Sequence, residues 1–339
     1  MPNDRFLRAT ICGFIFLVFV PLSAWADGPP CQPNPKYSVA DFSQPVTQLR
    51  SINGRSGFEE LKHFGIKTII RYYDLPDESF ACKTLVPAET DAILKNKFSI
   101  AVVYQHKSPD PESFFNANSG KIDAKRALEL ANANGQPFGS AIYFSVDGTD
   151  QSLRDVVFEH GMSNGGRISS ARRKLLRRNG QINHITHYER FLKYHKRMFD
   201  KPVEDIRASD ILPFVDKYFR SIHEVFRNAG YHNEDGKGFK VGAYGSGLIC
   251  SHLVKEKLVD YCWLAQSTGW PGYDSFLQGK KWSLLQKEPT YCRKWKLYSG
   301  GPVSFDFNKV NPANPDFGQW SSRRDTSRAF KRSAKCTVE

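Results

Sequence analysis

The sequence predicts an α/β protein, a single TIM-barrel-like (β/α)8 domain, on three observations. Eight short runs of apolar, β-branched or aromatic residues recur along the chain, and each is bounded by Gly, Pro or Asp. Segments with the helical spacing of apolar residues separate the early runs, and strands that alternate with helices are typically parallel. Runs that are apolar throughout, such as Ile100–Tyr104, suit strands covered on both faces. Eight strands of this kind favour a closed barrel.

The predicted strands, in chain order, are 37–42, 68–73, 99–105, 141–147, 239–244, 261–266, 282–286 and 303–307. The predicted helices are 57–64, 87–95, 122–134 and 211–229. A proline opens the second of these helices, where its missing N–H costs nothing. A doubly wound sheet is the alternative fold. The turn after the first strand, Asp41–Pro45, lacks the Gly-rich phosphate turn that such a sheet normally carries.

Residues 1–26 have the pattern of a secretory signal peptide. Arg5 and Arg8 precede an apolar run, 11–20, and Ala24-Trp25-Ala26 is a small-residue cleavage pattern. The apolar run is half the length of the roughly 20 residues that a spanning helix needs. We therefore expect cleavage after Ala26, rather than an uncleaved anchor, and a secreted or periplasmic protein with no stable membrane span.

The chain contains seven cysteines, and removal of the signal peptide with Cys12 leaves six. An even number in an exported protein favours disulfides, although the pairing stays open and buried free thiols are the alternative. These six are Cys31, Cys82, Cys250, Cys262, Cys292 and Cys336. No pair has Cys-x-x-Cys spacing, so a zinc knuckle is not indicated, and we expect neither a metal nor another cofactor.

The predicted domain spans 27–319, and two regions of the chain are strongly basic. Residues 151–207 hold 13 Lys and Arg against 6 Asp and Glu, and they form an insertion after the fourth strand. Residues 320–339 form a basic tail. The formal charge of the whole chain is +13, which suits an anionic partner. We expect no nucleic acid, because no recognition module is visible. One hypothesis is that the Arg/Lys cluster within 172–178 holds an anionic polymer, and a solvated basic face is the alternative.

Polar side chains stand at the ends of the predicted strands, where barrel enzymes carry their active sites. Asp41, Asp147 and Asp306 would converge on one mouth. Carboxylates act as general acids and bases, and carboxyl pairs are the machinery of glycoside hydrolysis. Helix caps are the alternative role for such aspartates. The predicted substrate-binding residues are Tyr72, Asp74, Tyr104, Gln105, Tyr143, Tyr244 and Gln286.

Several segments, taken in their order along the chain, carry a resemblance to a known family. The segments are Val39–Ser43, Lys67–Tyr73, Leu85–Ala92 with Glu89, Ile100–Gln105, Asp123–Ala127, Gly139–Asp147, Val241–Tyr244 and Ser304–Asn308. Their order resembles a secreted glycoside-hydrolase-like domain typified by a mycobacterial exported protein and classified as a domain of unknown function. That family is similar to the family-25 lysozymes, which are muramidases on a (β/α)-barrel.

The resemblance implies roles for three residues. Asp147 takes the place of the general acid in the Asp-x-Glu of those lysozymes, with a side chain one methylene shorter. Asp41 and Asp306 match the first-strand and last-strand aspartates, which would position substrate or stabilise developing positive charge. Ser145 stands where the lysozymes carry the partner carboxylate.

The favoured function is therefore glycoside-hydrolase-like action on a cell-envelope polysaccharide such as peptidoglycan. Two alternatives remain open. One is a non-catalytic glycan-binding envelope protein that keeps the cleft. The other is an exported protein that binds a polyanion and uses the barrel as a scaffold.

Overall fold

Eight strands close into the predicted barrel, in the spatial order β1-β10-β8-β7-β6-β5-β4-β3. The computed structural model describes residues 36–51, 54–74, 82–106, 118–146, 208–231, 238–289, 295–297, 303 and 305–324. The barrel strands are β1 (Val39–Phe42), β3 (Thr68–Tyr73), β4 (Ser99–Tyr104), β5 (Ala141–Ser145), β6 (Lys240–Gly245), β7 (Tyr261–Leu264), β8 (Leu284–Pro289) and β10 (Phe305–Val310). All eight predicted strands are confirmed, and so is the fold class.

One strand runs against the others. Neighbouring strands from β1 through β3 to β8 are parallel, but β10 is antiparallel to both β1 and β8. The reason lies in the connection from β8 to β10. In its described part it contains only β9 (Trp295–Leu297), which pairs with β2 (Leu49–Ser51), and a parallel neighbour would need a crossover. As a result, the start of β10 lies beside the carboxyl ends of the other strands.

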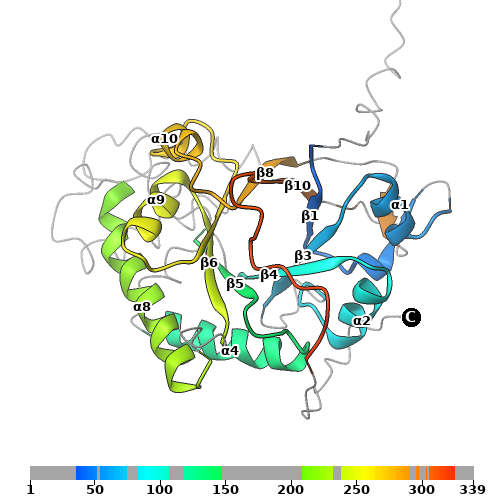
Figure 1. The fold of residues 1–339 in the computed structure, drawn as a ribbon, viewed down its shortest axis with the longest axis horizontal. Helices are drawn as coiled ribbons and strands as arrows, with labels where there is room; N and C mark the ends of the chain where they lie inside the picture. The colour runs from blue at the N-terminus through cyan, green and yellow to red at the C-terminus, as the bar shows by residue number, and fades with distance from the viewer. Residues whose placement is uncertain are drawn as a thin grey trace, which may run out of the picture.

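Helices surround the strands, as Figure 1 shows. They are α1 (Gly57–His63), α2 (Pro87–Lys95), α4 (Ser119–Ala133), α8 (Leu212–Asn228), α9 (Gly247–Lys255) and α10 (Tyr273–Gln278), with 3-10 turns η2 (Val46–Gln48) and η5 (Ala208–Ile211). The four predicted helices are all present. Local chemistry explains where two of the helices begin. Ser56 and Glu59 form a reciprocal capping box at α1, and the Ser246 hydroxyl accepts from the Ile249 N–H at α9.

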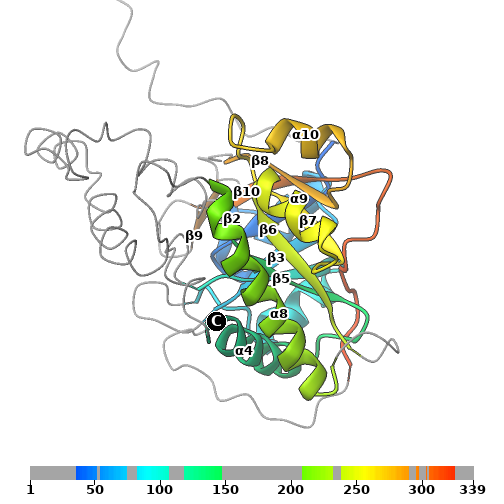
Figure 2. The same ribbon diagram turned by 90° about the vertical axis from the view of Figure 1, so that its left-hand side faces the viewer.

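Helices α4 and α8 pack closely beside the barrel (Figure 2). A Cβ placed at Gly120 of α4 would collide with the Tyr218 carbonyl of α8. Glycine therefore lets the two backbones approach. The apolar face of α8 buries Val215, Phe219 and Ile222 against the barrel.

The end of the barrel opposite the carboxyl ends of the parallel strands, called the floor below, is crossed by residues 311–324 (Figure 1). The Gly318 carbonyl accepts from the Ala141 N–H, and Trp320 exchanges two backbone hydrogen bonds with Ile100. The Arg324 guanidinium lies 4.2 Å from the centre of the Phe138 ring. These contacts hold residues 318–324 against the floor of the barrel.

The strands pack on two sides. Residues such as Val39, Ile70 and Trp263 fill the barrel interior, and the residues between them pack outward against the helices. A Cβ at Gly242 would lie 2.5 Å from the Tyr143 ring, so the interior holds this tyrosine only because its neighbour on β6 is glycine.

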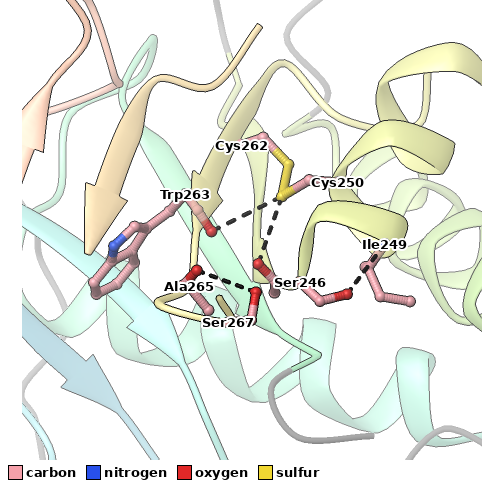
Figure 3. Close-up of a disulfide and its surroundings, with 8 residues drawn as sticks. Ser246, Ile249, Cys250, Cys262, Trp263, Ala265 and Ser267 are labelled. Atoms are coloured by element: carbon pink, nitrogen blue, oxygen red, sulfur yellow. Dashed lines mark hydrogen bonds between the residues drawn. A yellow bond between two sulfur atoms is a disulfide. The ribbon is translucent and has the colours of Figure 1, made fainter. Parts of the chain in front are cut away.

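A disulfide joins Cys250 of α9 to Cys262 of β7, with a Cα–Cα distance of 5.8 Å (Figure 3). Both cysteines are fully buried. Cys82 is also disulfide-bonded, whereas Cys31, Cys292 and Cys336 lie outside the described residues. The prediction of disulfides is thus confirmed for these three cysteines. Among the helices that the structure describes, none is long and apolar enough to cross a membrane.

Candidate functional site

Two predicted carboxylates face each other across neighbouring strands. Asp41 of β1 and Asp306 of β10 are register partners in the antiparallel pair. Asp41 has an exposed fraction of 3%, and its neighbours on either side, Ala40 and Phe42, point outward into the helix layer. Asp41 therefore points into the barrel, at the end where the parallel strands finish, which we call the mouth.

The side-chain amide of Asn308, on the neighbouring strand β10, orients Asp41. Asn308 Nδ2 donates to Asp41 Oδ2 at 2.7 Å, and the Tyr72 hydroxyl donates to Asp41 Oδ1 at 3.3 Å. Asn308 Oδ1 in turn accepts from Trp263 Nε1 at 2.7 Å. The sequence analysis missed Asn308. Its position two residues after Asp306 was the available signal, because alternate residues of a strand share a face.

A second amide holds Asp306. Gln286 Nε2 donates to Asp306 Oδ2 at 2.7 Å. Gln286 Oε1 accepts from the Tyr244 hydroxyl at 2.7 Å and from the Gln266 N–H at 3.3 Å. Gln286 and Tyr244 were predicted to bind substrate. The structure shows that their polar atoms position Asp306, and the Tyr244 ring lies 4.4 Å from the Trp263 ring.

Burial raises the pKa of both carboxyl groups, and the charge of Asp306 adds to the rise for Asp41. Burial lifts the pKa of Asp41 well above its ordinary value, the negative charge of Asp306 lifts it further, and the hydrogen bonds from Asn308 and Tyr72 oppose the rise. Burial raises the pKa of Asp306 to about 6, against the hydrogen bond from Gln286. Carboxyl groups with raised pKa values are candidates for acid–base chemistry.

A second charged group lies at the ends of β3 and β4. Asp74 accepts from Lys83 Nζ at 3.1 Å and lies 2.8 Å from His106 Nδ1. Lys83 Nζ is 4.9 Å from the centre of the Tyr72 ring and donates to the Gln105 carbonyl at 2.9 Å. Lys83 therefore links Asp74 to the tyrosine that contacts Asp41. The sequence analysis missed Lys83 and His106, because a lone lysine or histidine in a loop carries no pattern.

Two uncharged side chains, Gln105 and Ser145, form a pair at the ends of β4 and β5. Gln105 Nε2 donates to the Ser145 hydroxyl at 3.2 Å. Gln105 thus lies beside the end of β5. Asp147, the predicted general acid, lies outside the described residues, as does the basic insertion 151–207.

Two of the tyrosines predicted to bind substrate, Tyr104 and Tyr143, point away from the mouth. Tyr104 points outward and packs against Phe144 in the helix layer, with an exposed fraction of 1%. Tyr143 points inward but toward the floor, where its hydroxyl donates to the Phe317 carbonyl at 2.8 Å.

Comparison with protein families agrees with this geometry. Residues 59–161 match the model of the Rv2525c-like, glycoside hydrolase-like domain. The resemblance inferred from the strand ends is therefore confirmed.

The individual proteins that resemble this chain are distant from it in sequence. The uncharacterized protein FadG of Bacillus subtilis is 31% identical over 115 residues, which are 34% of this chain and 19% of FadG. This chain thus spans about a fifth of the length of that relative.

Solved structures that partly resemble this chain come from several organisms. The Tat-secreted protein Rv2525c of Mycobacterium tuberculosis is 18% identical, with a TM-score of 0.47 over 84% of this chain and 98% of that chain. The modular autolysin LytC of Streptococcus pneumoniae is 12% identical, with a TM-score of 0.40 over 80% of this chain and 46% of LytC. The spore cortex lytic enzyme SleM of Clostridium perfringens is 10% identical, with a TM-score of 0.40 over 83% of this chain and 69% of SleM.

Proposed function

We propose that this protein is an exported glycoside hydrolase that acts on a cell-envelope polysaccharide, with peptidoglycan as the first candidate. The observation that carries the proposal is the Asp41–Asp306 pair at the mouth of the barrel. Both carboxyl groups have raised pKa values, and each is held by an amide side chain. The glycoside hydrolase-like family match supports the same class of chemistry.

The roles follow from the chemistry of acetal cleavage. A general acid protonates the leaving oxygen, and a nearby negative charge stabilises the positive charge that develops on the sugar. We assign proton donation to Asp147, by the family resemblance. We assign positioning and charge stabilisation to Asp41 and Asp306. Export by the signal peptide and a ligand held by the basic insertion remain parts of this proposal.

One observation favours a second function, non-catalytic glycan binding. Ser145 stands where the related lysozymes carry a carboxylate, and its hydroxyl accepts from the neutral Gln105 amide. Ser145 itself therefore cannot supply the charge that would orient an acetamido group for attack. In the binding hypothesis, the aspartate pair would accept hydrogen bonds from sugar hydroxyls.

The experiment measures new reducing ends released from purified peptidoglycan by the protein without residues 1–26. Asp147→Asn and Asp306→Asn are assayed beside it, and sedimentation with the same peptidoglycan measures binding. Release that disappears in both variants supports the hydrolase. Binding without release by the unmodified protein supports the binding function, and neither binding nor release would contradict both functions for this polymer.

A further inference from the structure

Two buried acceptor atoms at the mouth have no hydrogen-bond donor among the described residues. They are Asp306 Oδ1 and Gln266 Oε1. Gln266 follows β7, so it lies where the parallel strands end, and Asp306 reaches the same end because β10 is reversed. A buried acceptor that lacks a donor destabilises a fold, and such atoms are rare in native proteins.

Gln286 connects the two acceptors. Its Nε2 donates to the other oxygen of Asp306 at 2.7 Å, and its Oε1 accepts from the backbone N–H of Gln266 at 3.3 Å. The Gln286 side chain thus binds both the Asp306 carboxylate and the backbone of Gln266, whose side chain carries the second acceptor. The two unsatisfied atoms are part of one hydrogen-bonded network rather than two separate defects.

The chemistry of this network defines its ligand. Asp306 Oδ1 belongs to an acidic group, and Gln266 Oε1 is a neutral carbonyl oxygen. Both accept hydrogen bonds when Asp306 is ionised. A carboxylate or phosphate of a ligand would be repelled here, whereas hydroxyl and amide N–H groups would satisfy both atoms.

We propose that Gln266 is a specificity-determining residue, whose Oε1 accepts a hydrogen bond from a sugar residue that also donates to Asp306 Oδ1. The inference rests on the proposed function and adds a substrate class to it. The subsite between β7 and β10 takes an uncharged face of a sugar, with two hydroxyl or amide N–H donors. Acidic groups of the polymer would have to lie outside this subsite.

The test compares Gln266→Met with the unmodified protein. Methionine keeps the length of the side chain but removes the amide oxygen. Gln278→Met is the matched control, because Gln278 is exposed on α10. The ligand is a soluble peptidoglycan tetrasaccharide of alternating N-acetylglucosamine and N-acetylmuramic acid. Isothermal titration calorimetry at pH 7 gives the Kd, and thermal unfolding of each free protein gives the Tm.

We expect Gln266→Met to raise the Kd about tenfold, the usual effect of one lost hydrogen bond, with a Tm equal to or above that of the unmodified protein. A merely structural glutamine would instead lower the Tm when replaced. Gln278→Met should change neither quantity. An unchanged Kd in Gln266→Met would overturn the inference while leaving the proposed function standing. If the unmodified protein did not bind the tetrasaccharide, the proposed function would fail for this polymer, and the role of Gln266 would fail with it.

Discussion

The two ends of the barrel hold carboxylates in opposite ways: Asp316 at the floor is exposed, whereas Asp41 at the mouth is buried. At the floor, Asp316 Oδ2 accepts from the Tyr261 hydroxyl at 2.5 Å and from Lys240 Nζ at 3.2 Å, and its Oδ1 accepts from the Gly318 N–H at 2.9 Å. At the mouth, Asp41 and Asp306 face each other, and one oxygen of Asp306 has no donor in the described part of the chain.

The pKa values express the same difference. Partial burial works to raise the pKa of Asp316, but the hydrogen bonds from Tyr261, Gly318 and Lys240 outweigh it and lower that pKa. At the mouth burial wins, and the pKa values of Asp41 and Asp306 rise. The comparison teaches that the floor is arranged for stability, whereas the mouth keeps unfavourable electrostatics that a ligand or a proton can relieve.

The largest expected effect is on activity and separates the two ends. Under the proposed function, Asp41→Asn should reduce release of reducing ends from peptidoglycan at least about 100-fold, because it removes a carboxyl group from the proposed sugar site. Asp316→Asn, the same substitution at the floor, should leave that rate unchanged. Equal losses in the two variants would show that the mouth carboxylate acts only through folding.

The pH dependence of stability gives a second comparison. Asp306 has a pKa of about 6 in the folded protein, above its value in an unfolded chain, so the folded state binds more protons between these values. Its contribution to stability is present below about pH 4, the unfolded pKa, and is lost as the pH rises through 6.

Urea unfolding from pH 4 to pH 7 measures this loss. The free energy of unfolding should fall relative to Asp306→Asn by up to about 1.4 kcal/mol per pH unit within this window. Asp316→Asn is again the control, because the lowered pKa of Asp316 acts in the opposite direction. Parallel curves for the unmodified protein and Asp306→Asn would contradict the raised pKa.

A smaller effect concerns the hydroxyl groups of two interior tyrosines. Tyr143→Phe leaves the Phe317 carbonyl without its donor at the floor and should lower the free energy of unfolding by about 1 kcal/mol. Tyr72→Phe at the mouth removes a longer bond to Asp41 and should cost less stability. It should, however, raise the pKa of Asp41, because that bond favours the charged form. Carbon-13 NMR titration of the aspartate carboxyl groups measures that shift, and no change in the titration would break the link between Tyr72 and Asp41.

The smallest effect is expected where charges lie at the surface. Lys121 and Glu224 join α4 to α8 at 2.8 Å, and both side chains are more than 40% exposed. Glu224→Gln should change the free energy of unfolding by no more than about 0.5 kcal/mol, because solvent screens the pair. Urea unfolding checks this value, and a loss comparable to that of Tyr143→Phe would show that the α4–α8 contact depends on the ion pair.

Much of the architecture follows from the sequence alone. The runs of apolar residues gave every strand of the barrel, because strands covered on both faces must be apolar throughout. Asp41 and Asp306 stood out because charged residues interrupt such runs. The same continuous apolar pattern did not show to which side each side chain points. In Ile100–Tyr104 both faces are apolar, so no alternation of polar and apolar residues marks the side to which Tyr104 points.

The direction of β10 was decided only by the tertiary structure. The predicted strand 303–307 places Asp306 near its carboxyl end, but β10 begins at Phe305 and places Asp306 near its start, where a parallel strand would carry it to the floor. The chain returns from β8 without a described crossover helix, so β10 runs antiparallel and brings Asp306 opposite Asp41. Thus the sequence by itself determined the strands and the two carboxylates. Closure of the barrel determined that they meet, since strand pairing is set by contacts between residues far apart in the chain.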